Sequence, residues 1–331
     1  MATPGRHRQA LTARVAERGS GRRGWALVLI VLITLAVAAL TTSAGAGFQA
    51  STTSLGISEP TLAPDTVTLR RGVRVDSANR SYEIIAPAHE AGPLPAIVML
   101  HGSEVTSADE ELRSGLLPYA STGKAVLIFP DAYHDAWNAG GGCCGLAGKH
   151  GIDDVGFLHA LLADLRSHLP VQPRRIYLGG YSNGAKLAFA VACAHPVDFT
   201  GIAVYGGYPL QRCTSSGPHP VPMMIAMGSA DPEMATKDPP STAPQHLATL
   251  GHAWHNRDGC RGAPSQTSIG MAVLRTWQRC SDDSRVQTVQ YDGVNHSWPA
   301  PHKMGYDYFT VVGREAAMAT LMWRFFSSVP R

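Results

Sequence analysis

A serine between glycines is the residue whose setting points most directly to chemistry. Ser182 stands between Gly180 and Gly184 in the segment GYSNG. The apolar residues 176–178 before it are typical of a buried parallel strand, and residues 185–194 after it favour a helix. In this setting a strained turn lifts the serine hydroxyl out of the end of a sheet, and glycines avoid collisions with the neighbouring strand and helix. We therefore predict that Ser182 is a nucleophile, with an ordinary helix N-cap as the alternative.

A neutral serine needs a general base, and that base needs a carboxylate to orient it. On this kind of strand, turn and helix, the acid follows the serine along the chain and lies at the carboxyl end of a later strand. Asp231 meets both conditions, because it follows the predicted strand 221–229 in the turn SADP. We predict that Asp231 is the acid; the alternatives are Glu233, Asp238 and an ordinary turn aspartate.

The base is expected after the last predicted strand. His296 lies in the loop NHSWP after strand 285–293, which places it at the same edge of the sheet as Ser182. We predict that His296 is the base, with His302 as the alternative. His101 also follows a predicted strand, but its position in an earlier loop favours a structural role.

Two backbone N–H groups must hold the negative oxygen that forms when a serine attacks a carbonyl. The first is expected from Asn183, the residue after the nucleophile. The second is expected from the loop LHGS, where Ser103 follows the predicted strand 95–102.

The order of strands and helices indicates the fold class. Apolar runs bounded by turn residues predict strands at 81–87, 95–102, 125–131, 175–182, 201–207, 221–229 and 285–293. Helical patterns cover 153–169 and 314–328, and the alternation of elements predicts a mostly parallel central sheet flanked by helices. We interpret 132–150 and 232–284, which lack a clear pattern, as loops around a pocket.

The N-terminal region has the pattern of an export signal. Residues 1–24 hold six arginines and one glutamate, and residues 25–40 form an uncharged apolar run. We predict a signal peptide over 1–46, with an uncleaved signal anchor as the alternative. A linker over 47–64 and one catalytic domain over 65–331 complete the predicted organisation.

The net charge depends on that N-terminal segment. The whole chain carries +3 and residues 1–24 carry +5, so the remaining residues carry −2. Nucleic-acid binding therefore has no support. Arg22 and Arg23 resemble a twin-arginine signal, which leaves the export route open. We expect a secreted protein, or one anchored with its catalytic domain outside, whose membrane contact is limited to an uncleaved N-terminal segment.

The six cysteines of an exported chain predict disulfides. We favour a bond between Cys260 and Cys280, which flank a segment rich in Gly, Ser and Thr. Cys193 and Cys213 are expected to pair with each other or with one of the adjacent cysteines 143–144. That adjacent pair could instead form a vicinal bond.

Metal binding is the competing interpretation of the cysteines and histidines. No Cys-x-x-Cys is present, and His252 and His255 lie one helical turn apart without an obvious third ligand. We therefore expect neither a metal site nor a cofactor.

Six motifs in a fixed order make a family resemblance specific. LHGS, WNAGGGCCG, IDDVGFL, GYSNGAKLA, MGSADP and NHSWP occur within about residues 80–325. Over this range the chain resembles the secreted esterases that include polyhydroxybutyrate depolymerases, feruloyl esterases and mycobacterial lipoprotein-type esterases. The resemblance implies an α/β-hydrolase fold in which Ser182, Asp231 and His296 form a triad that acts on carboxyl esters.

The same resemblance implies roles for further residues. In similar proteins Trp137 and Trp298 would lie near the acyl or alcohol pocket, and a packing role is the alternative. Asp153 and Asp154 resemble the family's paired acids before a helix, which we interpret as an N-cap and a structural hydrogen bond. The family often has a cysteine where this chain has Ser103, so one familiar disulfide is expected to be missing or rerouted.

Together these observations predict an exported serine carboxylesterase of feruloyl, acetyl or short polyhydroxyalkanoate type, acting through an acyl-enzyme. Its partner would be an ester, either a small molecule or one linked to a polysaccharide or polyester. A serine peptidase of similar fold and a non-catalytic cell-envelope binding protein are the alternatives.

Overall fold

The computed structural model describes residues 65–89, 92–211, 213, 219–237, 239–303 and 309–329. All of them belong to one compact unit, Glu59–Arg331. The signal peptide and the linker predicted for the first 64 residues lie outside the described residues, as does Asp238, and those interpretations stay predictions. None of the described helices is both long and apolar enough to cross a bilayer.

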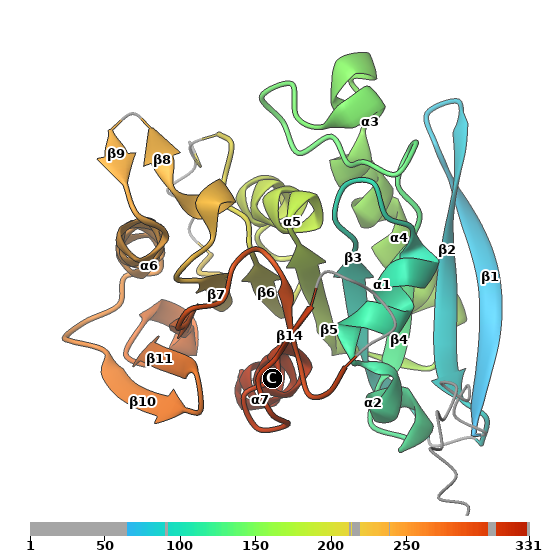
Figure 1. Cartoon of the computed structure of the whole chain (residues 1–331). Coiled ribbons are helices and arrows are strands. Elements are labelled where there is room, and N and C mark those ends of the chain that lie inside the picture. The colour runs from blue at the N-terminus through green and yellow to red at the C-terminus, as the bar shows by residue number, and fades with distance from the viewer. Residues whose placement is uncertain are drawn as a thin grey trace, which may run out of the picture. The chain divides into compact units, whose positions relative to one another are not determined.

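A ten-stranded sheet forms the centre of this unit (Figure 1). From edge to edge, its strands are β1 (Thr66–Val75), β2 (Ala78–Pro87), β4 (Val126–Pro130), β3 (Leu94–Leu100), β5 (Val171–Tyr181), β6 (Gly201–Tyr205), β7 (Met223–Gly228), β12 (Val286–Tyr291), β11 (Ala272–Trp277) and β10 (Ser265–Ile269). The six strands from β4 to β12 in this order are parallel, and the outer pairs are antiparallel. All seven predicted strands are present, which confirms the mostly parallel central sheet.

Helices cover both faces of the sheet. One face packs against α4 (Asp154–His168), α5 (Asn183–Ala194) and α6 (Ala243–Arg257), and the other against α2 (Leu117–Ser121) and α7 (Met318–Ser328). The remaining elements are α1 (Ser107–Ser114), α3 (Gly145–His150), the 3-10 turns η1 (Pro232–Met234) and η2 (Ser281–Asp283), and the short strands β8 (Thr236–Lys237), β9 (Pro240–Ser241), β13 (Trp298–Ala300) and β14 (Phe309–Val311). The helices predicted at 153–169, 185–194 and 314–328 correspond to α4, α5 and α7.

The central strands are apolar throughout because both faces of the sheet are covered. In β3, Val98 belongs to the core under α4 and α5, whereas Ile97 belongs to the core under α7. Leu178 and Tyr177 of β5 divide between the two cores in the same way, and all four side chains are buried. Two cores therefore hold the sheet in place, and its carboxyl edge has a fixed geometry.

The stretch 232–284 is more ordered than its sequence indicated. It contains α6 and the antiparallel hairpin β10–β11, which extends one edge of the sheet. These elements were missed because they do not form continuous apolar runs: β10 is largely exposed and α6 buries one side only. The edge strand β1, whose pattern alternates with arginines, was missed for the same reason.

Three disulfides join the six cysteines. The predicted bond between Cys260 and Cys280 is confirmed, and it closes the segment that contains the β10–β11 hairpin. Cys193 at the end of α5 pairs with Cys213, which leaves the adjacent cysteines 143–144 bonded to each other.

Candidate active site

Ser182 lies in a sharp turn between β5 and α5. Its backbone has φ +53° and ψ −114°, a conformation that costs an L residue about 1–3 kcal/mol. Gly180 and Gly184 make the turn possible. A Cβ at Gly180 would lie 2.6 Å from the Gly184 carbonyl oxygen, and a Cβ at Gly184 would lie 2.5 Å from the Leu100 carbonyl oxygen on β3. The start of α5 is thereby pressed against the neighbouring strand, and Ser182 lies at the carboxyl end of β5, as predicted.

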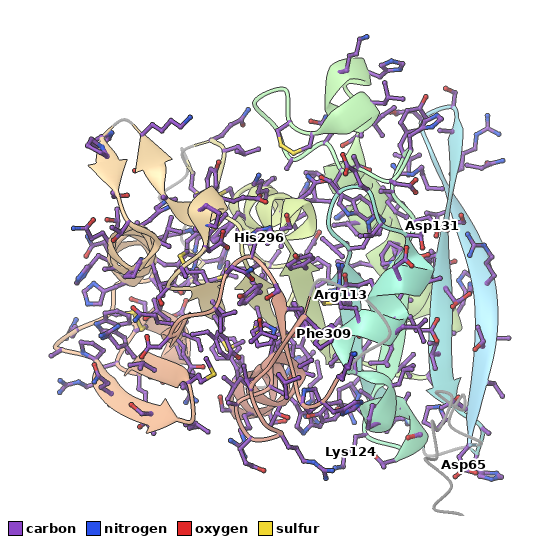
Figure 2. All side chains as sticks on the ribbon, viewed as in Figure 1. Asp65, Arg113, Lys124, Asp131, His296 and Phe309 are labelled. Atoms are coloured by element: carbon purple, nitrogen blue, oxygen red, sulfur yellow. A yellow bond between two sulfur atoms is a disulfide. The ribbon has the colours of Figure 1, made fainter. Side chains whose placement is uncertain are left out.

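His296, labelled in Figure 2, forms hydrogen bonds with both Ser182 and Asp231. Its Nε2 lies 2.9 Å from Ser182 Oγ, and its Nδ1 lies 2.7 Å from Asp231 Oδ2. Asp231 is buried, and its other oxygen accepts a hydrogen bond from the Glu233 N–H at 2.9 Å. A buried carboxylate at Nδ1 orients the imidazole so that Nε2 faces the serine. The structure therefore brings the three predicted side chains together, and their catalytic roles stay a prediction.

The loops that carry Asp231 and His296 follow the adjacent parallel strands β7 and β12 and contact each other. The Ala230 N–H donates to the Val294 carbonyl at 3.0 Å. Gly228 allows this approach, because a Cβ there would lie only 2.0 Å from the Val294 carbonyl oxygen. This backbone hydrogen bond between the two loops helps to hold Asp231 and His296 close together.

Two buried tyrosines also hold the histidine loop, and sequence analysis missed both. The Tyr181 hydroxyl donates to the His296 carbonyl at 2.7 Å, and the Tyr205 hydroxyl donates to the Asn295 carbonyl at 3.0 Å. Burial raises the pKa of both hydroxyls, so they remain protonated donors. The buried Arg113 guanidinium lies 4.2 Å from the centre of the Tyr181 ring. The sequence pattern placed both tyrosines in apolar strands and gave no sign of these hydrogen bonds.

The two residues predicted to hold the oxyanion adjoin the nucleophile turn in different ways. Asn183 is the first residue of α5, so its N–H has no acceptor within the helix. Gly102 packs against the nucleophile, because a Cβ there would lie 3.4 Å from the Ser182 Cβ, and Ser103 follows in an exposed turn. This placement is compatible with both amides serving the carbonyl of a bound ester, and that role stays a prediction.

Trp137 and Trp298 are core side chains, 0% and 1% exposed. Trp137 Nε1 donates to the His101 carbonyl at 2.9 Å, and Trp298 Nε1 donates to the Ser114 carbonyl at 3.3 Å. Neither indole has exposed surface with which to contact a substrate, so the packing alternative fits better. Trp137 supports the site in another way: its backbone N–H donates to Asn183 Oδ1 at 2.7 Å, which ties its loop to the nucleophile turn.

The other histidines considered from sequence do not face Ser182 Oγ. His101 is buried; its Nδ1–H donates to the Gly102 carbonyl at 2.7 Å, and its Nε2 accepts from the Ala132 N–H at 3.3 Å. Burial lowers the pKa of His101. With both nitrogens engaged, it cannot accept a serine proton. His302 is exposed in the loop after β13.

The paired acids before α4 have the expected structural roles. Asp153 caps the helix by accepting from the Gly156 N–H at 2.8 Å. Asp154 is buried, forms an ion pair with Arg80 at 2.7 Å, and accepts from the Asn138 N–H at 2.6 Å. Together they anchor the loop that precedes α3.

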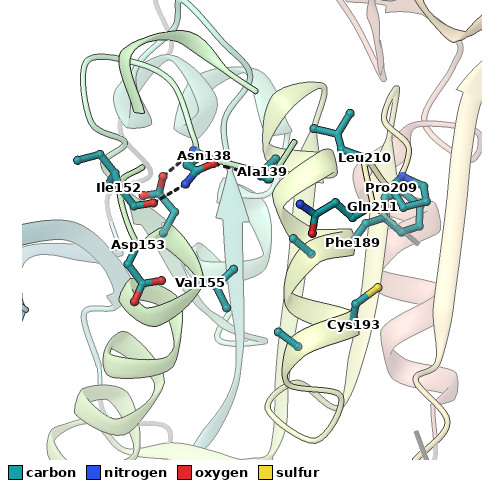
Figure 3. A pocket seen from close by; sticks show the side chains of 14 residues that line it. Asn138, Ala139, Ile152, Asp153, Val155, Phe189, Cys193, Pro209, Leu210 and Gln211 are labelled. Atoms are coloured by element: carbon teal, nitrogen blue, oxygen red, sulfur yellow. Dashed lines mark hydrogen bonds between the residues drawn. The ribbon is translucent and has the colours of Figure 1, made fainter. Parts of the chain in front are cut away.

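A pocket of about 310 Å³ opens between α4 and α5 (Figure 3). Asn138, Asp153 and Gln211 bring polar groups to its wall, and Phe189 and Leu210 bring apolar ones. None of the Ser-His-Asp group lines this pocket, so it is separate from the candidate active site.

Comparison with known proteins extends these observations. No protein-family model matches the chain. The chain is 30% identical over 191 residues to the protein named "Putative esterase NocK" from Nocardia uniformis subsp. tsuyamanensis, across 56% of this chain and 55% of that protein. It is 24% identical over 181 residues to feruloyl esterase C of Emericella nidulans, across 54% and 59%. The chain thus matches little more than half the length of these relatives.

Among solved structures, a dienelactone hydrolase-like promiscuous phosphotriesterase, P91, from metagenomic libraries matches with a TM-score of 0.53 and 14% identity, covering 80% of this chain and 99% of that one. The chain has the α/β-hydrolase fold. Its predicted fold is confirmed, and the relatives confirm the resemblance to the esterase family that includes feruloyl esterases. Ser182, Asp231 and His296 follow one another along the chain in the order expected of a triad on this fold.

Replacing Tyr181 with Phe removes the donor to the His296 carbonyl but keeps the ring. On the predicted role of His296 as the base, we expect kcat to fall about three- to tenfold with little change in KM, because the lost hydrogen bond is worth about 1 kcal/mol and helps to position that histidine. Steady-state kinetics with p-nitrophenyl acetate measures the effect.

The control for this variant is Tyr291→Phe, which removes a buried hydroxyl that donates to the Ala316 carbonyl at 2.8 Å. It should lower the free energy of unfolding without lowering kcat. An equal loss of kcat in both variants would contradict the positioning role of Tyr181.

Proposed function

We propose that this α/β-hydrolase is an exported serine carboxylesterase. The observation that carries the proposal is the hydrogen-bonded chain from Asp231 through His296 to Ser182 on a strained turn, in a protein whose relatives are named esterases. Export is supported by the apolar run at 25–40 and by three disulfides, since disulfides persist in oxidising compartments.

In the proposed reaction, Ser182 Oγ attacks the ester carbonyl while His296 Nε2 accepts its proton. The N–H groups of Asn183 and Ser103 stabilise the oxyanion. Protonated His296 then donates its proton to the leaving alcohol, and Asp231 stabilises the imidazolium. Water attacks the acyl-enzyme with His296 again as base, which releases the carboxylic acid and restores Ser182.

A second carboxylate faces the side on which the alcohol would leave. Glu233 Oε2 lies 3.5 Å from His296 Nε2, the nitrogen that contacts Ser182, and its side chain is 57% exposed. The leaving oxygen must come within hydrogen-bond reach of the same nitrogen to receive its proton. A hydroxyl on the neighbouring carbon of that alcohol is then close enough to donate to the Glu233 carboxylate.

This contact favours esters of polyhydroxy alcohols. An ester at a secondary hydroxyl of a sugar has a free hydroxyl on a neighbouring carbon, whereas the internal ester bonds of a polyhydroxyalkanoate have none. Carbohydrate esters are therefore the substrate class that we propose for this enzyme. The naming of a sequence relative as a feruloyl esterase is in keeping with this choice.

Replacing Ser182 with Ala tests the nucleophile. We expect kcat for p-nitrophenyl acetate and methyl ferulate to fall at least about 1,000-fold, because the covalent route is lost while the fold is kept. The matched control is Ser167→Ala on the exposed side of α4, where the hydroxyl donates a hydrogen bond to the Ala163 carbonyl. This variant should retain activity.

Circular dichroism shows whether the Ser182→Ala variant is folded. Near-normal hydrolysis by a folded variant would overturn the assignment of Ser182. A wild-type protein that cleaves aminoacyl amides but no ester would instead support the peptidase alternative.

Replacing Glu233 with Gln tests the proposed hydrogen bond between its carboxylate and a hydroxyl group of the alcohol. The substrates are 2-hydroxyethyl acetate and ethyl acetate, which share an acyl group and differ in the neighbouring hydroxyl. We expect the ratio of their kcat/KM values to fall about three- to tenfold in the variant, the size expected for a partly exposed hydrogen bond to a charged group. The matched control is Glu315→Gln, at an exposed site paired with Arg324, which should keep the ratio. An unchanged ratio in Glu233→Gln would contradict the proposed contact.

A further inference from the structure

A group of metal-binding side chains lies outside the candidate active site. His159 on α4, His195 at the end of α5 and Asp198 in the following turn place one ligand atom each within 4.8 Å of one another. It is the one such group among the described residues. It does not include His252 and His255, the two histidines that the sequence analysis considered as metal ligands. This group therefore leads to a proposal that departs from the sequence-based expectation of no metal site.

The carboxylate of this group is buried and faces one of the two histidines. The Asp198 side chain is 8% exposed, and its Oδ2 lies 2.8 Å from His159 Nδ1. Arg166 is close, but its guanidinium donates to the Asp198 backbone carbonyl at 2.9 Å rather than to the carboxylate. A positive charge beside a buried carboxylate offsets part of its desolvation cost, and a bound cation would supply that charge.

The two imidazoles are placed to complete a site with that carboxylate. The rings of His159 and His195 have centroids 5.0 Å apart and planes tilted by 27°. Two imidazole nitrogens and one carboxylate oxygen suit Zn²⁺, which binds such ligands at about 2.0–2.2 Å and accepts water as a fourth. The side chain of His159 is 57% exposed and that of His195 is half-buried, so both rings have room for the small approach that coordination needs.

We propose that His159, His195 and Asp198 bind a Zn²⁺ ion that ties α4 to the end of α5. The ion lies beside the pocket of Figure 3, since Val155, one turn before His159, and Ala194, next to His195, both line that pocket. Because only the folded chain brings the three ligands together, the bound ion stabilises the fold. The proposal does not depend on the esterase activity.

The test uses protein stripped with EDTA and then desalted. Titration with ZnCl₂ against a chromophoric chelator measures stoichiometry and Kd, and calorimetry measures Tm with and without the metal. We expect one tight Zn²⁺ per chain and a rise in Tm. His195→Gln should weaken binding at least about tenfold and abolish the rise, since it removes one of three protein ligands.

The matched control is the double variant His252→Gln/His255→Gln, which removes two histidines from a neighbouring helix and should leave both the Kd and the Tm rise unchanged. Absence of zinc binding, or tight binding that survives His195→Gln, would overturn the proposal. A Tm that falls in His159→Gln with no zinc effect in the wild-type protein would mean that His159 and Asp198 form only a structural pair.

Discussion

The backbone conformation of Ser182 is the constraint on which the candidate site depends. At φ +53° its N–H still donates to the Tyr205 carbonyl on β6 at 2.9 Å, and its carbonyl still accepts from the Lys186 N–H at 3.1 Å. The turn therefore keeps both its sheet bond and its helix bond while reversing the chain. Glycines at 180 and 184 remove the side chains that would separate α5 from β3 and β5. The strain is retained because the packed sheet and helix on either side leave the turn no alternative.

The other residues of the site are positioned relative to Ser182. Asp231 and His296 come from loops after adjacent parallel strands, and their backbones contact each other where Gly228 leaves room. Tyr181, the residue before the nucleophile, reaches across to the His296 carbonyl. The base is thus positioned from the acid loop and from the strand that carries the serine. A geometry supported from two directions suits a reaction in which one imidazole must both accept and donate a proton.

Burial explains which parts of the fold and of the site could be predicted from the sequence. The central strands and the Ser, Asp and His positions were readable, because strands covered on both faces are apolar and their carboxyl ends carry the polar residues. The hairpin β10–β11 was not, since an exposed edge has no such run. Tyr181 differs from a packing tyrosine only through its distant partner, and His159 and His195 come together only when α4 packs beside α5. Contacts of this kind depend on tertiary packing, which no local spacing encodes.

Covalent labelling tests the central claim most directly. A fluorophosphonate reacts with an activated serine and stays attached, and trypsin then releases residues 176–186 as a peptide in which Ser182 is the one serine. Mass spectrometry should find one label per chain, on Ser182, and none in a His296→Gln variant, because the base no longer activates the hydroxyl. Label on another residue, or an unlabelled Ser182 in protein that hydrolyses esters, would contradict the account.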